Sequence, residues 1–166
     1  MLEKKILEEL KNYIERHQYI DDLVVYKSAE EINYSLSESI QSIELEDFIN
    51  HHRKPTLKHV LFQFIDEKGA KDSDIYKKAG VDRKHFSKIR SNTDYRPGKN
   101  TIIALALALE LDKDETDELL GSAGFSLSDS DTTDLVIQFC LERKIYNIHD
   151  VNQALDYFSL KPLTNF

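Results

Sequence analysis

Residues 101–109 read Thr-Ile-Ile-Ala-Leu-Ala-Leu-Ala-Leu, a run that is apolar on nearly every face of a helix. Such a helix is normally buried at the centre of a small bundle, because any exposed face would leave apolar surface in water. The run is much shorter than the roughly 18–20 apolar residues that cross a bilayer, and no other run approaches that length. The sequence therefore predicts an all-α fold built around this segment, with no membrane span.

The composition is that of an ordinary globular chain. Its 166 residues are 40% hydrophobic and 31% charged, with five Gly, three Pro and no low-complexity tract. This length suits one ordinary domain, or one small domain with helical extensions. The first residues, MLEKKILEELKNYIERHQ, are charged and amphipathic where a secretory signal would be apolar, so we expect a cytoplasmic protein.

Helical periodicity divides the chain into three parts. We expect an N-terminal helical extension over 1–53, a central domain over 54–125 and a C-terminal helical pair over 126–166. Pro55 marks the first boundary, because proline disfavours helical geometry in the residue before it. The extension shows helical patterns over about 2–17, 28–42 and 45–52, and a short extended piece within 19–26.

The central domain contains five helical patterns, each with a recognisable start or stop. They cover about 56–67, 72–79, 83–91, 101–109 and 114–121. Asp72 and Asp82 are the expected N-caps of the second and third helices, and Gly69 and Gly80 are suited to end the helices before them.

The C-terminal pair is expected over about 131–144 and 148–158. Asp131 or Thr132 is the expected cap of its first helix, and Asn147 caps its second.

Charge is unevenly distributed along the chain. The net charge is −8, yet residues 54–100 carry twelve Lys or Arg against six Asp or Glu, a local net charge of +6. The remaining residues carry ten basic and twenty-four acidic side chains, a net charge of −14. A basic block within an acidic protein concentrates positive potential where phosphates can dock.

The basic block contains two helices joined by Ala79-Gly80-Val81-Asp82, the spacing of a helix-turn-helix. A glycine in this turn lets the chain reverse without a side-chain clash. On the helix at 83–91, Phe86 and Ile89 are expected to face inward and the basic residues outward. An exposed basic helix of this kind fits the major groove, where its early residues reach base edges.

Residues 75–90, Ile-Tyr-Lys-Lys-Ala-Gly-Val-Asp-Arg-Lys-His-Phe-Ser-Lys-Ile-Arg, resemble the second and third helices of the phage-repressor, or XRE, family. Pro97 and the helix 101–109 resemble the family's fourth helix. The resemblance covers about 65 residues and implies a lambda-repressor-like five-helix bundle. With its two further C-terminal helices, the chain also resembles uncharacterised bacterial proteins in which this module accompanies other domains.

The resemblance implies a cytoplasmic bacterial or phage regulator of transcription that binds double-stranded DNA as a homodimer. Its two helices at 83–91 would enter successive major grooves about 34–36 Å apart. The positions that match the family's contacts are Ser73, Arg83, Lys84, His85 and Lys88. The loop that follows offers further phosphate contacts, which are Arg90, Asn92, Arg96 and Lys99. Tyr95 could stack on a base, but we favour a role in covering the loop.

Two positions differ from the family pattern and favour an alternative function. Asp72 stands where a glutamine usually faces the operator, and Tyr76 replaces a small alanine, which demands looser packing or an outward-turned ring. The alternative is a helix-turn-helix-derived module that recruits a protein partner through its acidic flanks without binding DNA. RNA binding is a third and weaker reading, since the major groove of A-form RNA is too narrow for a helix.

No pattern in the sequence favours an enzyme, a metal site or a cofactor. Phosphate-binding glycine loops, nucleophile elbows and His-Glu-x-x-His patterns are missing from it. His51 and His52 are adjacent, so on a helix they point about 100° apart and make a poor pair of ligands. Cys140, the single cysteine, lies in an apolar run and is expected to be a buried hydrophobe.

Overall fold

Residues 42–164 of the chain are described by the computed structural model. All regular secondary structure in this range is α-helical, which confirms the all-α prediction. The chain divides into two units, Met1–Arg53 and Lys54–Phe166. The helices predicted over 2–17 and 28–42 and the extended piece within 19–26 lie outside the described residues, apart from Ser42.

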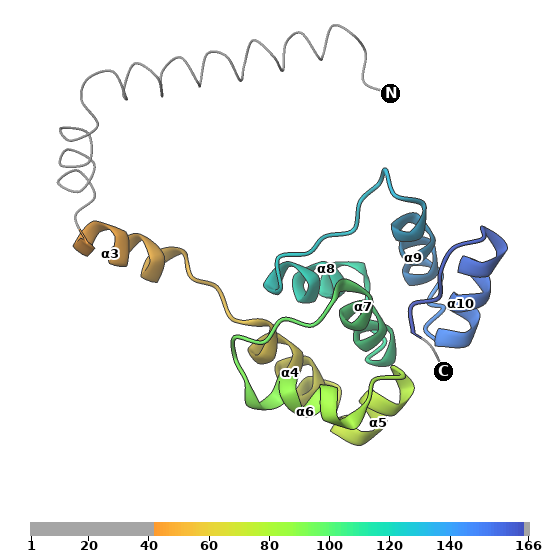
Figure 1. Ribbon diagram of the computed structural model, residues 1–166, viewed down its shortest axis with the longest axis horizontal. Coiled ribbons are helices and arrows are strands. Elements are labelled where there is room, and N and C mark those ends of the chain that lie inside the picture. The colour runs from red at the N-terminus through yellow and green to blue at the C-terminus, as the bar shows by residue number, and fades with distance from the viewer. Residues whose placement is uncertain (1–41, 165–166) are drawn as a thin grey trace, which may run out of the picture. The chain divides into compact units, whose positions relative to one another are not determined.

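The described part of the first unit is one helix, α3, Ser42–His52 (Figure 1). It includes the helix predicted from Leu45 and has the predicted end at His52. None of its residues is buried, and four large apolar side chains are exposed, which are Ile43, Leu45, Phe48 and Ile49.

The five helices predicted in the central domain are present in the second unit. They are α4, Leu57–Glu67; α5, Asp72–Lys78; α6, Arg83–Ser91; α7, Lys99–Ala108; and α8, Lys113–Ser122. Local capping explains several of their starts. Thr56 accepts a hydrogen bond from the backbone N–H of His59, and Asp112 forms a reciprocal capping box with Glu115.

Helix α7 is the buried centre of this unit, as the apolar run predicts. Every residue from Ile102 to Ala108 is buried, and α7 contacts α5, α8 and α10. The helix begins two residues earlier than predicted, directly after Gly98. Its first two residues, Lys99 and Asn100, are polar, so the apolar pattern did not include them.

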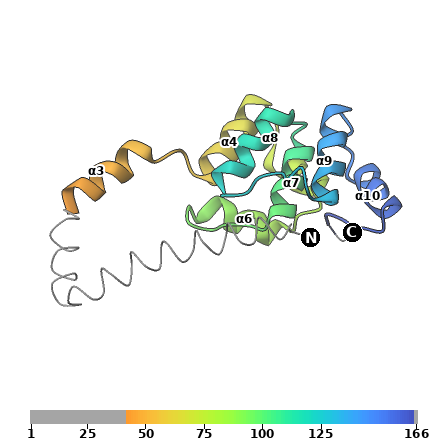
Figure 2. The same ribbon diagram turned by 90° about the horizontal axis from the view of Figure 1, so that it is seen from above.

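The two C-terminal helices are α9, Thr132–Glu142, and α10, Ile148–Tyr157. The predicted caps are confirmed: Asp131 accepts from the N–H of Asp134, and the Asn147 side chain accepts from the first turn of α10. The two helices pack on each other, α9 contacts α8, and α10 contacts α7 (Figure 2). The segment 126–166 therefore shares a unit with the segment 54–125.

Candidate nucleic-acid interface

The chain reverses direction at Gly80 in the turn between α5 and α6, as the sequence predicts. Gly80 has a φ of 66°, in the left-handed region that favours glycine. The N–H of Val81 bonds to the carbonyl of Tyr76 over 2.9 Å and closes the end of α5. Ala79 and Val81 are buried, so the turn is anchored in the core on both sides of the glycine. These contacts fix where α6 leaves the turn.

Helix α6 has one apolar face and one basic face. Phe86 and Ile89 are buried, whereas Arg83, Lys84 and Lys88 are exposed. The predicted cap is confirmed, because the Asp82 carboxylate accepts from the N–H of Lys84 over 2.9 Å. No acid occurs within the helix itself. Its solvent side therefore presents cations that a phosphate or a base edge can meet.

Tyr76 packs inward as part of an aromatic cluster. Its ring centroid lies 5.5 Å from that of Phe86, which in turn lies 5.9 Å from the ring of Phe62 on α4. The ring is half-buried, so it neither turns fully outward nor separates α5 from α6. The large side chain at this position is accommodated by aromatic neighbours on α4 and α6.

Asp72 does not cap α5, which corrects the prediction. Lys71 is the N-cap and makes no side-chain capping bond, and Asp72 is the first residue of the helix. The Asp72 carboxylate instead pairs with the guanidinium of Arg90 at the end of α6. That guanidinium also lies over the ring of Phe62, 5.3 Å from its centroid. Arg90 is thus already engaged by an acid and an aromatic ring.

His85 is held by the loop that follows α6. Its Nε2 lies 2.8 Å from the hydroxyl oxygen of Tyr95, and the two rings meet edge to face at 5.7 Å. Tyr95 is half-buried, in keeping with a covering role for its ring. This contact orients the imidazole of His85 beside the exposed cations of α6.

The remaining predicted contacts, Asn92, Arg96 and Ser73, lie in different parts of the fold. The Asn92 side-chain oxygen accepts from the N–H of Asp94 over 3.0 Å and tightens the start of the loop. Arg96 is exposed, and its guanidinium lies beside Gly124. Ser73 lies half-buried in the first turn of α5.

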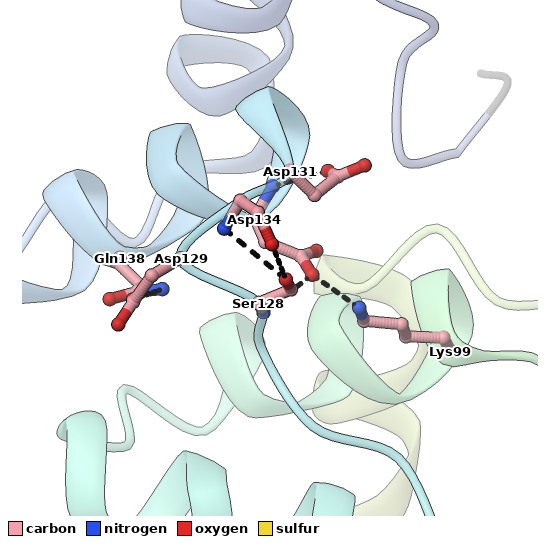
Figure 3. A network of polar contacts seen from close by, with 7 residues as sticks. Lys99, Ser128, Asp129, Asp131, Asp134 and Gln138 are labelled. Carbon is pink, nitrogen blue, oxygen red and sulfur yellow. Dashed lines mark hydrogen bonds and ion pairs between the residues drawn. The ribbon is translucent and has the colours of Figure 1, made fainter. Parts of the chain in front are cut away.

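Lys99 is directed at an acid on another helix. Its Nζ lies 2.6 Å from Oδ2 of Asp134 on α9, and the N–H of Ser128 donates to the same oxygen over 2.8 Å (Figure 3). Asp134 is buried and Lys99 is half-buried. The predicted basic contacts therefore differ in their surroundings. Arg83, Lys84 and Lys88 on α6 and Arg96 in the loop are exposed, whereas Lys99 and Arg90 are paired with acids. Long-range pairings of this kind leave no signal in local sequence.

Two exposed lysines were not included among the predicted contacts. Lys77 and Lys78 form the last turn of α5, directly before the turn that leads into α6. Their place beside the helix-turn-helix spacing was a usable signal, since basic residues near such a turn extend the positive surface.

Within residues 42–164, no group of three or more His, Cys, Asp or Glu side chains could hold a metal ion. The Nδ1 atoms of His51 and His52 each lie within hydrogen-bonding distance of the carbonyl four residues earlier. No helix in this range has the length and apolar character needed to span a bilayer. Comparisons of the chain with protein-family models, with curated proteins and with solved structures find no match.

Proposed function

We propose that the protein binds double-stranded DNA through α6 and regulates transcription in the cytoplasm, with α4–α8 forming a lambda-repressor-like helix-turn-helix bundle. The observation that carries the proposal is the division of α6 into two faces. Buried Phe86 and Ile89 hold the helix, and exposed Arg83, Lys84 and Lys88 face solvent with no acid among them.

The dimensions of α6 suit a major groove. An α-helix with its side chains is about 10–12 Å across, and the major groove of B-DNA is about 12 Å wide. The nine residues of α6 give two and a half turns to lie along it. Arg83 and Lys84 occupy the first turn, from which side chains of such a helix reach base edges. Lys88, one turn later, would neutralise a phosphate.

The position of Asp72 also supports the proposal. An unpaired carboxylate at the start of α5 would repel the DNA backbone. Because Asp72 pairs with Arg90, the two charges largely cancel.

The alternative is a module of the same shape that recruits a protein partner. One observation favours it: two of the predicted phosphate contacts, Arg90 and Lys99, are already paired with acids. The exposed basic set is therefore smaller than the sequence predicts. DNA binding is the better proposal because α6 itself retains its exposed cations.

A fluorescence-anisotropy titration with mixed-sequence duplex DNA at about 50 and 200 mM salt tests the proposal. We expect salt-sensitive binding, with a slope that becomes shallower by about two to three in Arg83→Ala/Lys84→Ala/Lys88→Ala. The matched control is Lys113→Ala/Lys144→Ala/Lys161→Ala, which removes the same charge from exposed positions outside α6.

The control is expected to bind nearly as the wild type does. If no duplex binds even at low salt, or if both triple variants lose affinity equally, DNA recognition by α6 is rejected. Recruitment of a protein partner then becomes the function to pursue.

A further inference from the structure

A cavity of about 350 Å³ lies between the last turn of α5, the last turn of α7 and the start of α10. Helix α7 contacts both of the other helices (Figure 1). Small-molecule sites in proteins have volumes of about 300–1,000 Å³, so this cavity has the size for a small ligand. The chemistry of its lining indicates which kind of ligand it can hold.

One part of the lining is apolar. Leu107 and Ala108 come from α7 and Ile148 comes from α10, and all three are buried, with exposed fractions of 0%, 6% and 4%. Side chains of this kind offer a ligand dispersion contacts and no hydrogen bonds. They therefore favour an aliphatic group on the ligand.

A second part of the lining is basic. Lys77 and Lys78 are exposed at the end of α5, and neither forms an ion pair with a residue that the structure describes. Each ammonium can therefore donate hydrogen bonds to an anionic group of a ligand without first leaving an acid. Part of the basic surface beside the turn thus faces this cavity.

A third part of the lining is acidic. Glu110 follows the end of α7, lines the cavity and is exposed, and no ion pair joins it to any residue within 42–164. Burial, followed by the charges of Glu110, Asp112 and Glu115, raises the pKa of the Tyr146 hydroxyl. Tyr146 also lines the cavity, so this side of it is at a negative potential that favours an ammonium group.

Charges of both signs thus line one cavity without pairing with each other. A purely anionic ligand would be repelled by Glu110, and a purely cationic one by Lys77 and Lys78. An α-amino acid carries a carboxylate and an ammonium on the same carbon, and it can carry an aliphatic group beside them. It is therefore complementary to all three parts of the lining.

We propose that this cavity binds an α-amino acid with an aliphatic side chain. Its carboxylate meets Lys77 and Lys78, its ammonium meets Glu110, and its side chain packs on the apolar part of the lining. The assignment goes beyond the proposed function and does not rest on it, because the cavity lies outside α6 and needs no DNA to form.

Isothermal titration calorimetry of the full chain without DNA tests the proposal, with L-valine, L-leucine and L-methionine as probes. We expect at least one of them to bind with a dissociation constant of about 0.1–1 mM. Two analogues of the best-binding amino acid test the role of each charge. Its amide lacks the carboxylate and the matching carboxylic acid lacks the ammonium, so each is expected to bind about 10-fold more weakly or worse.

Two variants test the lining. Lys77→Gln/Lys78→Gln and Glu110→Gln are each expected to weaken binding of the amino acid about 10-fold or more, because each removes one of the two charge contacts. All three side chains are exposed, so circular dichroism is expected to show unchanged helicity.

The matched controls are Lys113→Gln/Lys161→Gln and Glu118→Gln. They make the same changes of charge at exposed residues that do not line the cavity. Both controls are expected to bind the amino acid as the wild type does.

The proposal is overturned if none of the three amino acids binds at about 10 mM. It is also overturned if the carboxylic acid binds as tightly as the amino acid, if Glu110→Gln leaves binding unchanged, or if the controls lose as much affinity as the lining variants. Anisotropy with duplex DNA separates these results from the proposed function. A chain that binds the amino acid but no DNA keeps the site and rejects DNA binding, and the reverse result rejects only the site.

Discussion

The ammonium of Lys99 lies 2.6 Å from the carboxylate of Asp134, and this ion pair joins the first turn of α7 to the first turn of α9. The same carboxylate oxygen accepts the N–H of Ser128, so the connection between α8 and α9 is held at this point too. The side chain of Asp134 is 6% exposed and that of Lys99 is 29% exposed. An acid this well buried depends on its partners, because an unpaired buried charge is costly.

Lys99→Met is expected to lower the free energy of unfolding by about 2 kcal/mol, because it leaves Asp134 buried without its cation. Adding Asp134→Asn is expected to restore part of the loss, since a neutral amide is cheaper to bury. Urea denaturation of Lys99→Met, of Asp134→Asn and of the double variant measures the effect. The control is Lys113→Met, whose partner Asp117 lies 3.9 Å away on the surface and which is expected to cost less than about 0.5 kcal/mol. Strictly additive effects of Lys99→Met and Asp134→Asn would contradict this coupling.

Lys88 and Lys99 are expected to differ in DNA binding. Lys88 is exposed on α6, so Lys88→Met is expected to make the salt slope of duplex binding shallower by about one. Lys99 is held by Asp134, so Lys99→Met is expected to leave the slope unchanged. Anisotropy titrations across a salt series measure both slopes. Equal losses for the two variants would show that Lys99 leaves its ion pair to reach a phosphate.

Asp72→Asn is expected to tighten duplex binding about threefold to tenfold at about 50 mM salt, because it releases the guanidinium of Arg90 and removes a negative charge near α6. Stability is expected to change by less than about 1 kcal/mol, since Arg90 is largely exposed. Asp114→Asn on α8 is the control and is expected to leave affinity unchanged. Weaker binding by Asp72→Asn would indicate that the pair positions Arg90 for contact.

The protein is expected to lose stability at alkaline pH because Cys140 is buried. Burial, followed by the charge of Asp150, raises the pKa of its thiol above the usual 9.0. The folded state therefore keeps the proton where the unfolded state has released it, so the stability contribution is full below pH 9.0 and falls as the pH rises through the folded value. Urea midpoints under reducing conditions from about pH 7.5 to 10 are expected to fall more steeply in the wild type than in Cys140→Ala.

The pH series stops at 10.0 because Tyr146 would add its own effect above that pH. Burial, and then the charge of Glu110, raise the pKa of Tyr146 from 10.0. Parallel pH profiles for the wild type and Cys140→Ala would contradict a thiol origin. A constant offset between them would report only the packing lost with the sulfur.

The features that the sequence predicts well are local. Helix α7 was predictable because its apolar side chains leave it no face for water, and the caps Asp82, Asp131 and Asn147 bond to N–H groups within three residues. Each of these depends on a short stretch of chain whose chemistry is visible in the residues themselves.

Long-range pairings account for what the sequence did not predict. Asp72 has the chemistry of an N-cap, but its carboxylate is taken by a guanidinium eighteen residues later. Lys99 has the chemistry of a phosphate contact, but its partner acid is thirty-five residues away. The aromatic side chains of Phe139, Tyr157 and Phe158 resemble core residues in sequence, and only their exposure in the fold separates them from the core.

The burial of α7 by α5, α8 and α10 at once also determines how the second unit should open. Part of the surface of α7 is buried by α10. Removing the C-terminal pair α9 and α10 from the segment 54–125 would therefore expose α7 to water. Amide hydrogen exchange along α7 should then proceed only through global unfolding, at one common free energy. Cleaving the chain after residue 125 should turn those slowest amides into fast ones.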